Sequence, residues 1–455
     1  MSALSRRPLA VAGGILLGLA SGLLVERHTS MAILLCIVIV GILGLATLGD
    51  RAFPWAIVIV AVSPWFPLYA RETSSPVVER KEFAAAIAAA VLVPWLWSLA
   101  LGARGTRPSR ASLLVGLLFA GLTLVIYVTL GGVSQMTNGS VVGFPFLGVA
   151  FLCARRFETA RGWPAAAFGG LLILVLFGAE AYLSAPNLRL GYFVGYPITY
   201  GALIVGVLPL ALLFALRRSK LLAGVVIAVS VAFLIFSESR SSWIASIVVL
   251  IVLVALLARQ GNFRPLAMVC AAMVVAVGLI LGTGSLHKVI EQRVNSKTAA
   301  TISVTHRTWS YGYAIEQVEK HPVFGAGVPG FAATEAEHRT DIGALDNGYL
   351  SITVDMGLIG LLAVLIPIGV ALRALGRWLR LGSSPAPVDL ALALGVLGLA
   401  VVTVFYDSFY WAQIDLLLGA MGGVLSVRLR DAAPRSAYVE RISQPAAQPA
   451  LMSAR

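Results

Sequence analysis

Apolar runs long enough to cross a membrane recur along almost the whole chain, and they constrain its fold more than any other feature. A spanning helix needs about 20 apolar residues at a rise of about 1.5 Å per residue. Charged residues make up only 12% of the chain, against about 25% in soluble domains. The sequence therefore predicts an all-α polytopic membrane protein with about 12 transmembrane helices, or up to about 14 if two weaker runs also cross. The main runs lie at 9–25, 31–48, 53–70, 83–102, 111–130, 165–185, 196–216, 221–237, 242–258, 265–283, 346–372 and 388–405, and the weaker ones at 141–153 and 408–427.

Clusters of basic residues fall on alternate connections between these runs, and they predict the orientation of the chain. Cytoplasmic loops of membrane proteins carry an excess of Lys and Arg, so these connections and both termini are expected on the cytoplasmic side. The intervening loops at 71–82, 186–195, 238–241 and 285–345 then face the opposite compartment. The net charge of +13 is spread over many loops. It forms no continuous basic face, so nucleic-acid binding is not expected.

One polar stretch, Ser285 to Leu345, interrupts the apolar pattern and offers the main place for water-soluble chemistry. It divides the chain into an N-terminal transmembrane bundle (1–284), a loop domain expected to carry the active site (285–345) and C-terminal transmembrane helices (346–430). The remaining residues 431–455 are rich in Ala, Pro, Ser and Arg. They are predicted to form a disordered cytoplasmic tail.

The polar stretch has local organisation of its own. Residues 307–320 show the periodicity of an amphipathic helix, with an apolar face made of Tyr311, Ala314, Ile315 and Val318. Pro322 is expected to end this helix, because proline disfavours the helical conformation in the residue before it.

Glycines and aromatic residues follow the predicted helix. Gly325, Gly327 and Gly330 predict sharp backbone turns, with Phe324 and Phe331 as anchors. A further short helix is predicted over 332–340. Asp346 or Asn347 is expected to cap the membrane helix that comes next.

Basic side chains occur in each of the four outer loops at 71–82, 186–195, 238–241 and 285–345. Arginine offers planar, bidentate donors that stay charged, so cations that converge on one membrane face would suit a diphosphate or another polyanion. The alternative is that these charges are scattered and bind lipid headgroups. The candidates are Arg80 and Lys81 in the first loop, Arg189 in the second, Arg240 in the third, and Arg307 and His338 in the large loop.

Ionisable residues inside apolar runs are costly in a bilayer and therefore draw attention. Glu180, Glu238, Arg240, Asp355, Asp407 and Asp415 are the examples in this chain. Asp355 is expected to face protein or water, and Asp415 to pair within the bundle. The sequence assigns neither of them a catalytic role.

Three segments together resemble the O-antigen ligase and polymerase superfamily of bacterial envelope glycosyltransferases. The first is Ser237-Glu-Ser-Arg240-Ser-Ser-Trp243, which is similar to a Ser-x-Ser-Arg motif at an outer helix start. The second runs from Arg307-Thr-Trp309 to Pro322-Val-Phe-Gly325-Ala-Gly327, like Arg-x-x-Trp followed by Pro-x-x-Gly-x-Gly. The third is Asp346-Asn347-Gly-Tyr-Leu350 followed by Gly357-Leu-Ile-Gly360-Leu. The resemblance covers roughly residues 187–375.

The resemblance implies glycan transfer at the periplasmic face of the bacterial inner membrane, on a fold like the membrane-embedded GT-C glycosyltransferases. The donor would be a polysaccharide on undecaprenyl diphosphate, and the acceptor a sugar hydroxyl of lipid A–core, which would yield lipopolysaccharide. The reaction would invert the anomeric carbon and need neither metal nor cofactor. Arg189, Arg240, Arg307, Lys81 and Arg80 would stabilise the diphosphate charge.

The general base is open between two residues. Ligases of this family commonly have His just before the Asn of the third motif, and here that position is Asp346. His338, upstream in the same loop, could bring an imidazole to the same site, and we favour it over Asp346 as the base. Asp346 could alternatively cap the helix or orient His338. His287, His306 and His321 are competing histidines.

Other functions share some of these features. An O-antigen polymerase would use the same motifs with a polyprenyl-linked glycan as acceptor, and a protein O-oligosaccharyltransferase would use a Ser or Thr hydroxyl. A lipid or glycan transporter is an alternative of a different class, but such proteins often show internal repeats and midplane charges. No repeat is evident in this chain, and its charges cluster at one face.

Overall fold

The computed structural model describes residues 53–62, 144–156, 162–184, 190–191, 194, 196–261, 310–326 and 345–443. These residues are helical or lie in turns, and no strand occurs among them. The predicted all-α class is therefore confirmed. The helices are α3 (Phe53–Val62), α6 (Phe144–Arg156), α7 (Trp163–Ser184), α8 (Pro197–Arg218), α9 (Lys220–Phe236), α10 (Arg240–Arg259), α15 (Gly348–Leu381), α16 (Pro387–Val404) and α17 (Ala412–Ser443), with a short 3-10 helix, η6 (Ser408–Tyr410), before α17.

Within this part of the chain, six helices are long and apolar enough to cross a membrane. They are Trp163–Leu183, Pro197–Arg218, Arg240–Arg259, Gly348–Leu381, Pro387–Val404 and Ala412–Arg430. α3, α6 and α9 are apolar but shorter. The polytopic architecture is confirmed, while the count of about 12 spans extends over residues outside the described ranges and stays a prediction.

Local sequence signals set the ends of these helices. Ser219, Ser239 and Asn347 occupy N-cap positions, and each accepts a hydrogen bond from a backbone N–H of the first turn. α15 ends at Gly382, whose φ of 60° is the left-handed conformation common after helices. α17 continues to Ser443, so the tail predicted to be disordered from residue 431 begins with helix. Its Ala, Arg and Glu residues are good helix formers.

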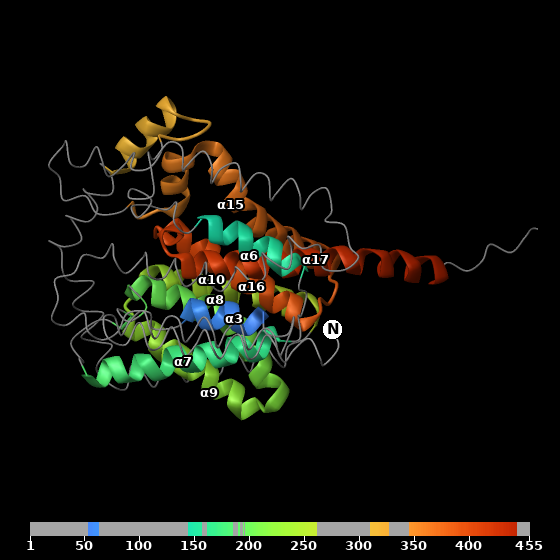
Figure 1. The fold of residues 1–455 in the computed structure, drawn as a ribbon. Helices are drawn as coiled ribbons and strands as arrows, with labels where there is room; N and C mark the ends of the chain where they lie inside the picture. Colours follow the sequence, from blue (N-terminus) through green and yellow to red (C-terminus); the bar gives the residue numbers. More distant parts are fainter. Residues whose placement is uncertain are drawn as a thin grey trace, which may run out of the picture.

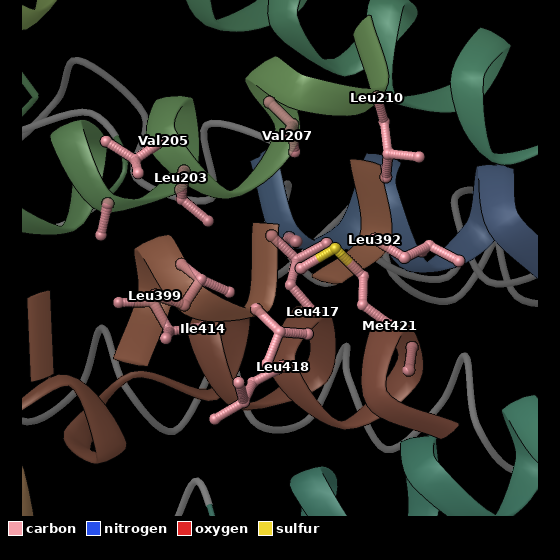
Figure 2. Close-up of a cluster of buried hydrophobic side chains, with 14 of the residues drawn as sticks. Leu203, Val205, Val207, Leu210, Leu392, Leu399, Ile414, Leu417, Leu418 and Met421 are labelled. Carbon is pink, nitrogen blue, oxygen red and sulfur yellow. The ribbon is translucent and has the colours of Figure 1, made fainter. Parts of the chain in front are cut away.

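The bundle has α8 and α16 near its centre (Figure 1). α16 packs against α8, α10 and α15, and α7 packs against α8 and α3. Figure 2 shows the core between α8, α16 and α17, where branched aliphatic side chains interdigitate around Met421. α17 lies along α6, and Gly419 and Gly423 allow this close approach because a Cβ at either position would meet the α6 backbone.

The weak run at 408–427 is helical from Ala412 and belongs to the most deeply buried span. Its hydropathy is low because it contains Gln413 and Asp415, which are 2% and 0% exposed. These polar side chains face protein rather than lipid. The run at 141–153 also forms a helix, α6, which is shorter than a full span.

Candidate functional site

Several segments that are distant in the sequence meet at one end of the bundle. Leu190 N donates to Phe236 O at 3.3 Å, and Thr199 Oγ1 lies 3.1 Å from the Tyr406 hydroxyl. Ser351 Oγ donates to Asp407 Oδ2 at 2.7 Å. We call the region made of residues 190–200, 236–243, 346–357 and 403–415 the polar end. It includes the first turns of α8, α10 and α15.

The Ser-x-Ser-Arg segment forms a tight, buried turn between α9 and α10. Ser237, Ser239 and Ser242 are buried, and Ser239 Oγ lies 2.8 Å from Ser242 Oγ. Glu238 adopts a φ of 51°, the left-handed conformation that non-glycine residues rarely take. The serines therefore fix this turn by hydrogen bonds within it, and their role is structural.

Arg240 is the first residue of α10 and its side chain is exposed. The N-terminus of a helix carries a partial positive charge that favours anions. The neighbouring turn places Ser239 and Ser242 against Gly201 of α8. The motif thus holds one exposed cation at the junction of α8, α9 and α10.

The helix over 310–320 packs against the start of α15. Ala314, Leu345 and Val354 form a small core, and Tyr311 and Val318 pack against it. Tyr311 donates its hydroxyl to Asp346 O at 3.2 Å. This confirms an amphipathic helix that ends at Lys320, before Pro322.

One residue of the predicted apolar face is placed differently, since Ile315 is 52% exposed. Periodicity identifies an apolar face but cannot fix its width, and only Ala314 at its centre is fully buried. On the exposed face, Lys320 Nζ pairs with Glu316 Oε1 at 2.7 Å. This hydrogen bond lowers the pKa of Glu316 and raises the pKa of Lys320.

α15 is broken at Gly357, where φ is 66° and ψ is −167°. The break disrupts the i to i−4 hydrogen bonding of the helix and leaves backbone groups that need other partners. Residues His321–Ala326 supply them. Ala326 N donates to Val354 O at 2.7 Å, Leu358 N donates to Pro322 O at 2.9 Å, and Ile359 N donates to Val323 O at 3.4 Å. We call this docked loop the clasp.

The clasp explains two glycines of the family-like motifs. Gly325 has a φ of 74°, and a Cβ there would meet the backbone of Asp355. A Cβ on Gly357 would meet the carbonyl of Val323. The turn predicted at Gly325 is confirmed, but Phe324 is 60% exposed and does not anchor the loop. Backbone hydrogen bonds anchor it instead. Gly327, Gly330, Phe331 and the short helix predicted over 332–340 lie outside the described residues.

Asn347 caps α15, with its Oδ1 accepting from Leu350 N at 3.0 Å. Of the two residues expected to cap this helix, Asn347 therefore does so, and Asp346 precedes the cap as a half-buried residue. The interpretations of Asp346 as base or as a partner of His338 stay predictions.

A network of buried polar side chains around Tyr406 was not foreseen from the sequence. The Tyr406 hydroxyl contacts Thr199 and accepts a hydrogen bond from Trp411 Nε1, and its ring stacks on Tyr196 with centroids 6.0 Å apart. Burial raises the pKa of Tyr406, so its hydroxyl keeps its proton. The sequence signal was Asp407, an acid in an apolar run, which accepts from Ser351 of α15.

Asp415 and Gln413 are buried polar residues at the start of α17, and they differ from the Tyr406 network in their hydrogen bonding. Neither has a hydrogen-bond partner in the described part of the chain. The expectation that Asp415 pairs within the bundle is therefore not met there.

The structure describes only some of the residues predicted to act in catalysis. Arg240 and Asp346 both lie at the polar end. His338, Arg189, Arg307, Lys81 and Arg80 lie outside the described residues, so the convergence of the cations stays a prediction. Leu190, next in sequence to Arg189, is hydrogen-bonded to Phe236 beside the Ser-x-Ser-Arg turn. In the described ranges no three His, Cys, Asp or Glu residues gather to hold a metal ion.

The segment that contains the Ser-x-Ser-Arg turn, the clasp and the start of α15 matches a known family. The family model described as O-antigen ligase covers residues 225–365. Residues 225–365 are therefore similar to this family, and we call them the O-antigen ligase domain after it. The resemblance to the O-antigen ligase and polymerase superfamily is thus confirmed on the motifs that suggested it. No curated protein matches the chain.

The similarity indicates the chemistry of the family in broad terms. Members of this family are glycosyltransferase-like enzymes, either ligases or polymerases. Their substrates are in general lipid-linked glycans and lipid acceptors. A multi-pass membrane protein with an O-antigen ligase domain fits such substrates, because both remain anchored in the bilayer.

Proposed function

We propose that the protein is an O-antigen ligase. It transfers a polysaccharide from undecaprenyl diphosphate to a sugar hydroxyl of lipid A–core at the periplasmic face of the bacterial inner membrane. The O-antigen ligase domain at 225–365 carries this proposal. Of its two described motifs, the Ser-x-Ser-Arg turn belongs to the polar end, and the clasp is bonded to Val354 of α15 in that region.

The donor binds through its diphosphate. Arg240 supports this role because its exposed guanidinium stands at the N-terminus of α10, where the helix dipole adds to its charge. Arg189, Arg307, Lys81 and Arg80 supply the remaining cations. Together they stabilise the charge that develops on the leaving diphosphate.

The transfer is a single displacement. The acceptor hydroxyl oxygen attacks the anomeric carbon of the donor sugar, and the bond from that carbon to the diphosphate oxygen breaks. Undecaprenyl diphosphate leaves with the bonding electron pair, and the hydroxyl proton passes to the base. His338 is that base, and an imidazole that titrates near neutrality suits this step. Asp346 is the alternative base.

The described structure supports this arrangement by fixing the residues on both sides of the segment that carries His338. Ala326 is bonded to Val354 O, and Leu345 packs against the same residue. The described residues on either side of 327–344 thus both contact Val354 of α15. Closing a loop in advance lowers the entropy cost of placing a side chain within it.

The test is transfer in vitro with purified protein, an undecaprenyl-diphosphate glycan and lipid A–core, in the presence of EDTA and without ATP. Glycan on lipid A–core is the expected product. Longer glycans on the polyprenyl carrier would identify a polymerase instead. Transfer to a polypeptide supplied as competitor would identify a protein O-oligosaccharyltransferase. Folded protein with no turnover of any kind would refute the proposal and favour a transporter.

A further inference from the structure

Within the part of the chain that the structure describes, the clasp presents an exposed apolar surface. Val323 is 48% exposed and Phe324 is 60% exposed. The hydrogen bonds from Leu358 N to Pro322 O and from Ile359 N to Val323 O hold the clasp directly against α15. Leu358 is itself 48% exposed. The exposed apolar surface therefore continues from the clasp onto the helix.

On α15 this surface becomes a stripe along a membrane-spanning helix. Leu358, Leu362, Leu365 and Leu372 are all exposed, and their spacing puts them on one side of the helix. α15 is one of the candidate spans, so an exposed leucine stripe on it faces hydrocarbon. The clasp lies next to the N-terminal end of that stripe.

The length of the apolar part of α15 places the clasp relative to the bilayer. Residues 358–372 contain no polar side chain, and Arg373 marks their far end. The hydrocarbon core needs about 20 helical residues. If the hydrocarbon core begins beside Arg373, it extends along α15 past Gly357. The clasp contacts α15 at Gly357 and therefore lies within the depth of the hydrocarbon core.

Several backbone groups of the clasp have the partners that such a place requires. Irregular backbone is tolerated at membrane depth only where its polar groups have partners. The carbonyls of Pro322 and Val323 accept hydrogen bonds from α15, Ala326 N donates to α15, and Gly325 N donates to His321 O at 3.0 Å. Pro322 has no N–H to satisfy.

The charge distribution changes at the same point. Glu316, Glu319 and Lys320 are exposed on the helix just before the clasp, whereas Val323 and Phe324 carry no polar group. A boundary between water and hydrocarbon at Pro322 accounts for the charged residues before it and the apolar residues after it. We infer that the clasp is immersed in the membrane, and that Val323 and Phe324 contact acyl chains of the leaflet on the side of the polar end. The polar stretch 285–345 is thus not wholly a water-exposed loop, and this inference does not depend on the reaction.

The experiment measures the depth of single spin labels in proteoliposomes of phosphatidylethanolamine and phosphatidylglycerol. The three native cysteines are first replaced (Cys36→Ala, Cys153→Ala, Cys270→Ala), and a nitroxide is attached at Phe324→Cys or Val323→Cys. Lys320→Cys is the matched control in water, and Leu362→Cys is the matched control in lipid. Collision with oxygen, which concentrates in hydrocarbon, is compared with collision with a water-soluble nickel chelate.

At Phe324 and Val323 we expect oxygen to dominate, with a ratio of the two collision rates closer to that at Leu362 than to that at Lys320. Labels at both positions that collide with the nickel chelate as often as the label at Lys320 would overturn the inference. So would labels at both positions shielded from both reagents, because that would mean protein covers the clasp. Both positions are exposed, so cysteine there should disturb little packing.

Discussion

The two ends of the helix bundle hold their polar residues in different ways. At the polar end, buried side chains bond across helices, as Ser351 of α15 does to Asp407 before α17. At the opposite end, which we call the basic end, Arg217, Arg259 and Arg380 are exposed on the last turns of their own helices. Arg218 lies over the ring of Phe214 on the same helix.

This difference separates two uses of charge in one membrane protein. Basic residues at helix ends complement the helix dipole and orient the chain, and Arg428 also pairs with Asp389 on another helix. Polar groups that bond across helices fix the geometry at their end, which is what a binding or catalytic site requires. The predictions below test whether the polar end takes part in the reaction and whether the basic end only sets the orientation of the chain in the membrane.

The largest effect is expected from removing the proposed base. His338→Ala should lower the rate of glycan transfer by about 10²- to 10⁴-fold, the usual contribution of general base catalysis. His321→Ala is the matched control. Its exposed side chain should be dispensable, and only its backbone carbonyl is used in the clasp. Rates are compared at saturating donor and acceptor.

A near-normal rate for His338→Ala would remove this residue from the mechanism. If Asp346→Asn then abolished transfer while the helix cap at Asn347 was intact, Asp346 would take its place as the base.

The next largest effect is expected from disrupting the clasp. Gly357→Ala forces a side chain into a backbone conformation that costs on the order of 1–3 kcal/mol and against the Val323 carbonyl. It should lower both the melting temperature and the transfer rate. Gly369→Ala on the same helix has open space around it, and it should be neutral or slightly stabilising. Equal melting temperatures and transfer rates for the two variants would show that the clasp contributes neither to stability nor to transfer.

A smaller effect is expected from the bond between α15 and Asp407. Ser351→Ala removes a buried donor to a carboxylate and should cost about 1–3 kcal/mol in unfolding free energy, with a partial loss of transfer. Ser426→Ala is the control, because Ser426 Oγ donates only to Gly423 O of its own helix at 2.7 Å. Thermal unfolding in detergent compares the two, and a loss at Ser426 as large as that at Ser351 would contradict the distinction.

The smallest effect on function is expected at the basic end. Arg428 of α17 pairs with Asp389 of α16, and their side chains are only 24% and 12% exposed. Arg428→Ala leaves a buried carboxylate without its partner and should lower the unfolding free energy by about 3–5 kcal/mol. The transfer rate should not change. A strong loss of transfer in stable Arg428→Ala protein would mean that the basic end takes part in the reaction.

The sequence predicted the kind of fold well, because membrane helices are specified locally by apolar length. It underrated the run at 408–427, because hydropathy counts Gln413 and Asp415 as polar without knowing that they face protein. It also misjudged Phe324, since an apolar side chain in a loop can face lipid as readily as a protein core.

The candidate site was predictable as a set of motifs but not as an arrangement. The Ser-x-Ser-Arg and Pro-x-x-Gly segments both lie within the O-antigen ligase domain. The pairing of the clasp with α15 depends on the backbone conformations of Gly325 and Gly357, which no periodicity reveals. The choice of Asn347 over Asp346 as the helix cap likewise depends on one side-chain hydrogen bond.

The most direct test of the account compares the two ends of a single helix. Arg240 begins α10 at the polar end, and Arg259 ends it at the basic end; both are exposed. At limiting donor, Arg240→Ala should slow transfer by about 10- to 100-fold, the effect of losing a charge-assisted hydrogen bond of about 1.5–3 kcal/mol. Arg259→Ala should stay within about twofold of the wild-type rate. Equal rates for the two variants would contradict the assignment of function to the polar end.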